Sequence, residues 1–133
     1  MKKIYLAIPY SGMEEESYAL ATRVTALLMI GEEKMNVFSP ITHCHPMTKL
    51  EGVTMPGDWE FWKAIDLQYI DWCDEMIVIV PEAGYNKVLE SIGVQAEIDY
   101  CAKQGKHITF MQLSSSDTIQ KTVMQPNLDK YGN

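Results

Sequence analysis

Two neighbouring stretches of the sequence decide the fold: Met76-Ile-Val-Ile-Val80 and, after a loop, Glu90-Ser-Ile-Gly-Val-Gln-Ala-Glu97. The first is a short, continuously apolar run, which is typical of a strand buried on both faces. The second predicts a helix that begins near Ser91 and continues to Lys103. A strand, a loop and a helix in this order place the start of the helix at the carboxyl edge of a sheet. That edge is where open α/β folds bind their ligands.

The rest of the chain repeats this alternation. Further strands are expected at residues 3–8, 35–38 and 107–111, and further helices at residues 14–30 and 59–72. The order predicts an α/β fold: a single-domain, three-layer sandwich with a mostly parallel, Rossmann-like (flavodoxin-like) sheet and helices on both faces. We expect one domain over residues 1–133, with residues 113–133 as a loosely packed tail that carries a short helix at 117–124.

Two segments between these elements are predicted to be loops, at residues 39–57 and 81–90. A loop longer than about 12–15 residues in a compact domain is usually functional or mobile. The 39–57 segment is therefore a candidate cover for a site.

Composition limits the partners of this chain of 133 residues. Its formal net charge of −7 argues against binding to duplex nucleic acid, which needs clustered Lys and Arg. No apolar run approaches the roughly 20 residues of a membrane span, so no membrane partner is expected. The three cysteines are widely spaced and form no Cys-x-x-Cys pair, which is typical of reduced thiols. We expect a cytoplasmic protein.

The predicted helix start near Ser91 combines free backbone N–H groups, a hydroxyl and a carboxylate. Helix N-termini attract anions, so the segment indicates a site for a small phosphorylated molecule beside a reactive acid. If the helix begins near Gly93, then Ser91 and Glu97 can face one cavity; alternatively, Glu97 points to water from a surface helix. Asp66 shares a helix face with apolar residues. It is either a carboxylate aimed at the strand ends or a partly exposed acid on a helix edge.

Other chemistries have weaker support in the sequence. His43, Cys44 and His45 lie close together but have no further ligand nearby, so no metal is expected, although either histidine could line a pocket. Gly-x-Ser-x-Gly, Gly-x-Gly-x-x-Gly and the P-loop pattern are all absent. We therefore expect no cofactor.

Four parts of the sequence resemble a known family: Tyr5-Leu-Ala-Ile-Pro-Tyr-Ser11, Asp66, Asp74-Glu-Met-Ile-Val-Ile-Val80 and Ser91-x-Gly-Val-x-x-Glu97. Together they resemble the nucleoside 2-deoxyribosyltransferase-like superfamily over residues 3–111. Within it, the chain is most similar to a small group that is often encoded by phages or prophages and is nucleotide N-hydrolase-like.

The resemblance implies cleavage of an N-glycosidic bond. Glu97 would be the nucleophile, Asp66 would assist the departing base or position the sugar, and Tyr5 would orient the nucleophile or the ribose. Ser91 matches a serine that binds the 5′-phosphate in the nucleotide N-hydrolase branch. The implied activity is that of a nucleotide N-glycosidase acting on a nucleoside 5′-monophosphate, with transfer to another base as a variant.

The resemblance also implies how the rest of the site is built. Members of the superfamily commonly form homodimers or higher homo-oligomers, in which a neighbour completes the site. The further substrate-binding residues would be Gly93, Pro9, Tyr10, Ser11, His43 and Trp62, with Ser114, Ser115 and Ser116 from the neighbouring subunit. The turn after the first strand departs from the pattern, because it lacks the basic residue that nucleotide hydrolases carry. Two alternatives remain: a nucleotide sensor without catalysis, and a phage-encoded interaction protein of the same fold.

Overall fold

The computed structural model of the protein describes residues 1–113 and 119–122, which form a five-stranded sheet with the order β2-β1-β3-β4-β5. The strands are β1 (Lys3–Ala7), β2 (Asn36–Phe38), β3 (Glu75–Ile79), β4 (His107–Leu113) and β5 (Ile119–Thr122). Strands β1 to β4 pair in parallel, and β5 pairs antiparallel with β4. This order is the flavodoxin-like one, so the predicted fold class is confirmed.

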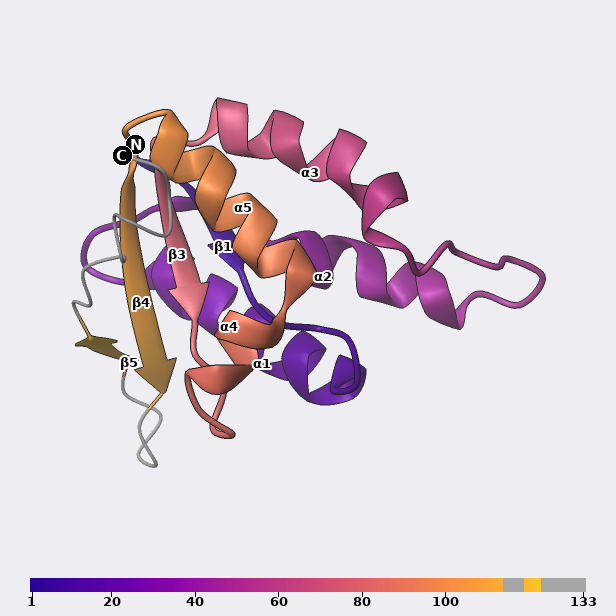
Figure 1. Cartoon of the computed structure of the whole chain (residues 1–133). Coiled ribbons are helices and arrows are strands. Elements are labelled where there is room, and N and C mark those ends of the chain that lie inside the picture. Colours follow the sequence, from indigo (N-terminus) through magenta and orange to yellow (C-terminus); the bar gives the residue numbers. More distant parts are fainter. Residues whose placement is uncertain (114–118, 123–133) are drawn as a thin grey trace.

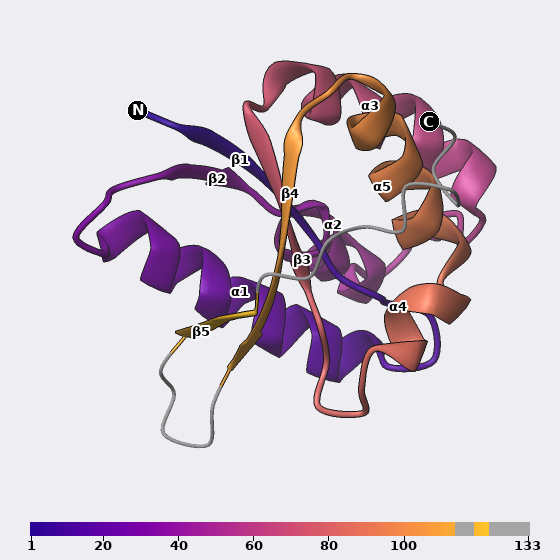
Figure 2. The same cartoon turned by 60° about the vertical axis from the view of Figure 1, so that its left-hand side comes forward.

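Helices cover both faces of the sheet. They are α1 (Glu14–Ile30), α2 (Pro40–Cys44), the 3₁₀ helix η1 (His45–Lys49), α3 (Trp59–Trp72), α4 (Asn86–Glu90) and α5 (Ile92–Lys103). Helices α3 and α5 lie on one face and α1 lies on the other (Figure 2). The segment of α2, η1 and the loop that follows extends away from the sheet (Figure 1).

The alternation of side chains along each strand explains the continuous apolar runs. On β1, Tyr5 and Ala7 join the core beneath α3 and α5, whereas Ile4 and Leu6 join the core beneath α1. Both faces are buried, so every position of the strand favours an apolar or aromatic side chain. This register points the ring of Tyr5 toward α5.

Three local predictions were wrong. The 39–57 segment is not one loop, because Ser39 and Pro40 start helix α2: the Ser39 hydroxyl oxygen accepts a hydrogen bond from the Thr42 N–H at 3.1 Å. The 81–90 segment contains α4. The helix expected at 117–124 is replaced at residues 119–122 by β5, which pairs with β4. Residues 114–118 and 123–133 of the expected tail lie outside the described part of the chain.

None of the helices in the described segments is both long enough and apolar enough to span a bilayer.

Candidate active site

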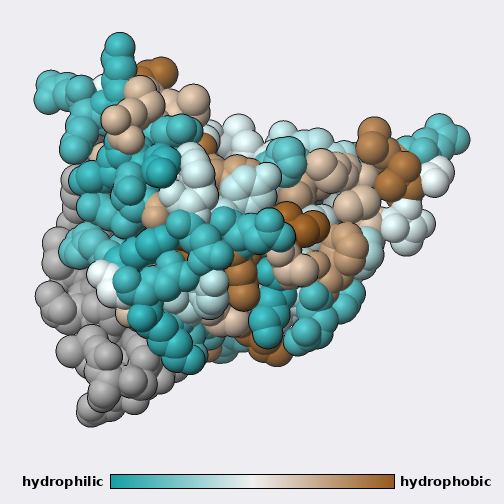
Figure 3. Space-filling view, turned by 90° about the horizontal axis from the view of Figure 1, so that it is seen from above, coloured by the Kyte–Doolittle hydropathy of each residue, from teal (hydrophilic) through white to brown (hydrophobic). Residues whose placement is uncertain are grey.

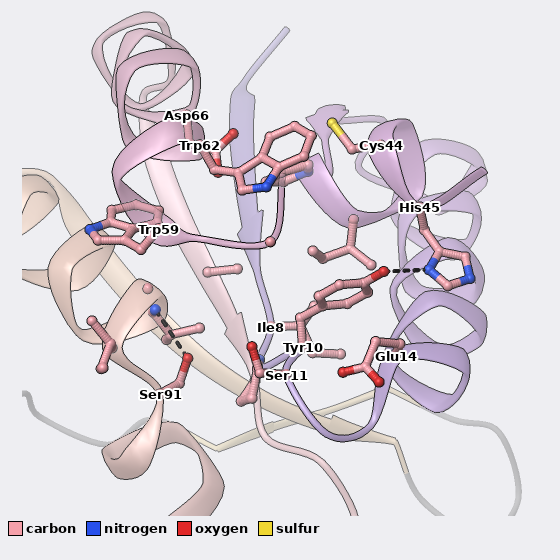
Figure 4. Close-up of a pocket in the computed structure, with 18 of the residues that line it drawn as sticks. Ile8, Tyr10, Ser11, Glu14, Cys44, His45, Trp59, Trp62, Asp66 and Ser91 are labelled. Atoms are coloured by element: carbon pink, nitrogen blue, oxygen red, sulfur yellow. Dashed lines mark hydrogen bonds between the residues drawn. The ribbon is translucent and has the colours of Figure 1, made fainter. Parts of the chain in front are cut away.

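A cavity of about 740 Å³ lies beyond the carboxyl end of β1, within the size range of small-molecule sites. Its floor is the turn that follows β1, and α3 and the start of α5 form two of its walls. The α2–η1 segment and residues 55–57 form the remaining side. Figure 4 shows Trp59, Trp62 and Asp66 on one side of this cavity and Tyr10, Ser11 and Ser91 on the other.

Glu97 lines the cavity from α5 and is only 6% exposed, so it does not point to water. Its Oε2 atom accepts a hydrogen bond from the hydroxyl of Tyr5, which is fully buried on β1 directly beneath it. Burial raises the pKa of Glu97 to about 8; the hydrogen bond from Tyr5 opposes this shift and the charge of Asp66 adds to it. Burial and the same two carboxylates keep the pKa of Tyr5 well above its ordinary value, so Tyr5 remains a hydrogen-bond donor.

Asp66 reaches the cavity from α3 and is also 6% exposed. Its Oδ1 atom is buried and has no hydrogen-bond partner among the described residues. Burial raises the pKa of Asp66 to about 7. An unpartnered carboxyl oxygen is costly to bury, and here it borders a cavity, so it is available to a ligand.

Ser91 is the N-cap of α5: its hydroxyl oxygen accepts a hydrogen bond from the Val94 N–H at 3.2 Å. The N–H groups of Ile92 and Gly93 belong to the first turn, where a helix provides no internal acceptors. A Cβ atom on Gly93 would lie 3.4 Å from the ring of Trp59. Lys87 of α4 lines the same end of the cavity and adds a positive charge. This end can therefore hold an anionic group.

Trp62 of α3 is hydrogen-bonded to the segment after η1 that forms one side of the cavity. Its indole N–H donates to the carbonyl oxygen of Pro56 at 2.8 Å, which holds the segment after η1 beside the helix. Trp59 and Trp62 both face the cavity and offer aromatic surfaces to a planar ligand.

The cavity also contains a thiol. Burial raises the pKa of Cys44 to about 11, with the charge of Asp66 as a further cause. Cys44 therefore stays protonated at neutral pH and is a poor nucleophile. Among residues 1–113 and 119–122, no three His, Cys, Asp or Glu side chains are grouped to hold a metal ion.

Most residues singled out from the sequence meet at this one cavity. Those that line it are Glu97, Asp66, Ser91, Gly93, Pro9, Tyr10, Ser11 and Trp62. Tyr5 lies beneath it, bonded to Glu97. His43 is exposed outside it, with its ring 5.7 Å from that of Phe38, and His45 lines the cavity instead. Ser114, Ser115 and Ser116 fall in the part of the chain that is not described.

Sequence reasoning missed Lys87 and two acids at the cavity edge, Glu14 and Glu90. Lys87 and Glu90 belong to α4, which is too short to give a periodic signal. Glu14 was read only as a charge in the first turn of α1.

This arrangement of sheet and helices is that of the nucleoside 2-deoxyribosyltransferase-like fold. The 2-deoxyribosyltransferase from the psychrotolerant bacterium Bacillus psychrosaccharolyticus aligns over 96% of this chain and 79% of its own, with a TM-score of 0.53 and 23% identity. The 2-deoxyribosyltransferase from Leishmania mexicana aligns over 98% and 85%, with a TM-score of 0.57 and 18% identity. The resemblance expected from the sequence is confirmed at the level of the fold.

The chain belongs to the family described as a domain of unknown function, DUF1937, whose model matches residues 2–113. No curated protein matches the chain.

Proposed function

We propose that this protein cleaves the N-glycosidic bond of a nucleoside 5′-monophosphate, with Glu97 as the nucleophile and without a cofactor. The observation that carries the proposal is the pairing of two buried carboxyl groups, Glu97 and Asp66, on one cavity, with Tyr5 bonded to the first. Its fold is shared with two 2-deoxyribosyltransferases, one of which is described as a biocatalyst for nucleoside synthesis.

In the proposed reaction, Glu97 attacks the anomeric carbon of the sugar. Tyr5 occupies Oε2 of Glu97, which leaves Oε1 as the attacking atom. The new bond forms between Oε1 and the anomeric carbon while the bond to the base nitrogen breaks. The departing electron pair takes a proton from Asp66. Water then attacks the anomeric carbon, Asp66 takes a proton from that water, and Glu97 is released as a carboxylate.

In this mechanism the two acids share one proton: Asp66 must be protonated and Glu97 must be ionised when the reaction begins. Their raised pKa values, about 8 for Glu97 and about 7 for Asp66, favour a single negative charge on the pair near neutral pH. A sugar that develops positive charge beside Glu97 stabilises its carboxylate, and the hydrogen bond from Tyr5 does the same. The proton is then on Asp66, where the leaving base needs it.

The phosphate would bind at the Ser91 end of the cavity. Ser91 supplies a hydroxyl, the first turn of α5 supplies N–H groups, and Lys87 supplies the charge that the turn after β1 lacks. Binding energy from the phosphate would orient the sugar against Glu97.

The test is release of free base from a panel of ribo- and deoxyribonucleoside 5′-monophosphates, followed by chromatography. The wild type is expected to release base, and Glu97→Gln to lose on the order of 10³-fold or more in rate while remaining folded. Binding of nucleotides by the wild type without release would contradict the proposal and favour a sensor. Absence of binding would favour an interaction protein.

A second candidate is base exchange between free nucleosides. Glu90 lines the cavity next to Ser91, and a carboxylate there can accept a hydrogen bond from a 5′-hydroxyl but repels a phosphate. Parallel assays with nucleosides and nucleotides, each with and without an added free base, separate the two. Faster reaction of the nucleoside together with formation of a new nucleoside would favour exchange.

We further propose that the protein is encoded by a phage or prophage, is cytoplasmic and forms a homo-oligomer. The structural argument concerns the homo-oligomer. Several large apolar side chains are exposed, among them Phe61 and Ile65 on α3 and Leu50 and Val53 after η1. Figure 3 shows hydrophobic surface on the end of the molecule formed by that segment. Light scattering on the purified protein tests this: a dimer or larger species is expected, and a monomer at micromolar concentration contradicts it.

A further inference from the structure

Tyr10 and His45 form a polar pair at the end of the cavity away from Ser91 (Figure 4). The hydroxyl oxygen of Tyr10 lies 2.6 Å from Nδ1 of His45. His45 is only 4% exposed, and the ring of Tyr18 stacks on it with 4.5 Å between the centroids. The imidazole is therefore fixed in place behind the hydroxyl of Tyr10.

The charge nearest to His45 favours a proton on its Nε2 atom. Nε2 lies 3.4 Å from Oε2 of Glu15 without a hydrogen bond between them, and Glu15 also forms an ion pair with Lys49. The hydrogen bond from Lys49 lowers the pKa of Glu15, so this carboxylate is ionised and can only accept. A proton on Nε2 faces that negative charge favourably.

At pH 7 and above, the neutral imidazole is the common form of a histidine, and one of its two nitrogens is then an acceptor. With the proton on Nε2, the Nδ1 atom of His45 is an acceptor, and the hydroxyl of Tyr10 must donate to it.

The groups that line this end of the cavity are therefore hydrogen-bond acceptors. Tyr10 has committed its only proton to His45, so its oxygen offers lone pairs. The neighbouring Thr48 hydroxyl donates to the carbonyl oxygen of His45 at 2.7 Å, so its proton is also committed. Glu14, which lines the same end, is a further carboxylate. A ligand group that fits here must donate hydrogen bonds.

We propose that this end of the cavity selects a nucleobase with an exocyclic amino group, adenine or cytosine, over the corresponding oxo base. Tyr10 contacts the amino group, and His45 is a positioning residue that keeps the Tyr10 oxygen an acceptor. The proposal rests on the proposed function, because a phosphate held near Ser91 and a sugar beside Glu97 direct the base toward Tyr10. An oxo group there would place a second acceptor against the first.

Two pairs of ligands test the proposal: the 5′-monophosphates of deoxyadenosine and deoxyinosine, and those of deoxycytidine and deoxyuridine, with their ribose counterparts. In each pair an oxo group replaces the amino group, and the adjacent ring nitrogen gains a proton. The wild type is expected to favour the amino member of a pair by about tenfold in kcat/KM, the effect of one hydrogen bond. Dissociation constants measured with Glu97→Gln should show the same preference without turnover.

Variants separate the role in selection from a structural role. Tyr10→Phe should lower kcat/KM for amino members about tenfold and leave oxo members within about twofold. His45→Gln should move the ratio toward one, since glutamine does not fix the Tyr10 proton. Tyr18→Phe is the matched control: it removes a phenol hydroxyl outside the cavity but keeps the ring that stacks on His45, and the ratio should not change.

The outcomes distinguish this inference from the proposed function. Base release at equal rates within both pairs, or an equal loss for both members in Tyr10→Phe, overturns the inference and leaves the glycosidase proposal standing. Preferential binding of amino members without base release supports the inference and overturns the glycosidase. Failure to bind any of these nucleotides overturns both.

Discussion

The Tyr5 hydroxyl on β1 donates a hydrogen bond to Oε2 of Glu97 on α5, joining two residues 92 positions apart in the sequence. Both side chains are buried, and Glu97 also forms part of the cavity wall. This bond fixes the carboxyl group from below and favours its ionised form. The proposed nucleophile is therefore held by the sheet itself.

Loss of this bond should slow the chemical step. Tyr5→Phe keeps the ring but removes the donor, so we expect kcat to fall by about 10- to 100-fold with little change in KM. Steady-state kinetics of base release measure both. Tyr100→Phe is the matched control, because Tyr100 donates to the Asp71 carboxylate at 2.7 Å on the surface. An equal loss in both variants would contradict a role for Tyr5 in the site.

Asp66→Asn should remove the proton donor. We expect kcat to fall by about 10²- to 10⁴-fold, with a smaller loss for substrates whose leaving group needs no proton. Asp71→Asn changes an exposed acid on the same helix and should leave kcat unchanged. A rate for Asp66→Asn that matches the wild type on natural nucleotides would exclude Asp66 as the acid.

The pH dependence of the wild type should follow the pair of acids. Both acids are protonated well below pH 7 and both are ionised well above pH 8, so kcat/KM should pass through a maximum between these limits. Asp66→Asn should lose the fall at high pH. A profile that stays flat from pH 5 to 9 would contradict the assignment.

Glu97 should also make the stability of the protein depend on pH. Its pKa is raised from 4.5 to about 8, so the folded state binds the proton more tightly than the unfolded state does. The contribution is favourable below about pH 4.5 and is lost as the pH rises toward 8. Glu97→Gln does not titrate at this position. The free energy of unfolding of the variant minus that of the wild type should therefore be about 1–3 kcal/mol larger at pH 8 than at pH 5. Urea unfolding at both pH values measures this, and an unchanged difference would contradict the burial of an ionisable Glu97.

Lys87 should contribute to phosphate binding. Lys87→Ala is expected to raise KM for a nucleoside 5′-monophosphate by about tenfold and to leave KM for the free nucleoside unchanged. Lys103→Ala is the control, since Lys103 pairs with Asp99 at 3.9 Å on the surface. Equal changes in KM for the nucleotide and the nucleoside would show that Lys87 does not bind the phosphate.

The fold was predictable because most of its strands and helices leave a hydrophobic pattern within their own stretch of sequence. Strands buried on both faces give continuous apolar runs, and α1, α3 and α5 are long enough to show helical spacing. Helices α2 and α4 are too short for that signal, although Ser39 and Pro40 form a recognisable helix start. The strand at residues 119–122 depends on pairing with β4, a contact that local preference does not reveal.

The site was predictable where a residue shares the spacing of the core. Glu97 lies three residues after Val94 and four before Cys101, both buried, so it occupies the inner face of α5. No such pattern marks Lys87. The substrate-binding histidine predicted from the resemblance was His43, but His45 lines the cavity; the short helices around the two residues decide which one enters it.

The most direct test of the central claim is mass spectrometry of the protein after reaction with a nucleoside 5′-monophosphate whose sugar carries a 2-fluoro group, which slows hydrolysis of a glycosyl ester. We predict a sugar-phosphate adduct on the tryptic peptide of residues 88–103, at Glu97, and no adduct in Glu97→Gln. Release of base by the wild type with the adduct at another residue, or with none, would contradict Glu97 as the nucleophile.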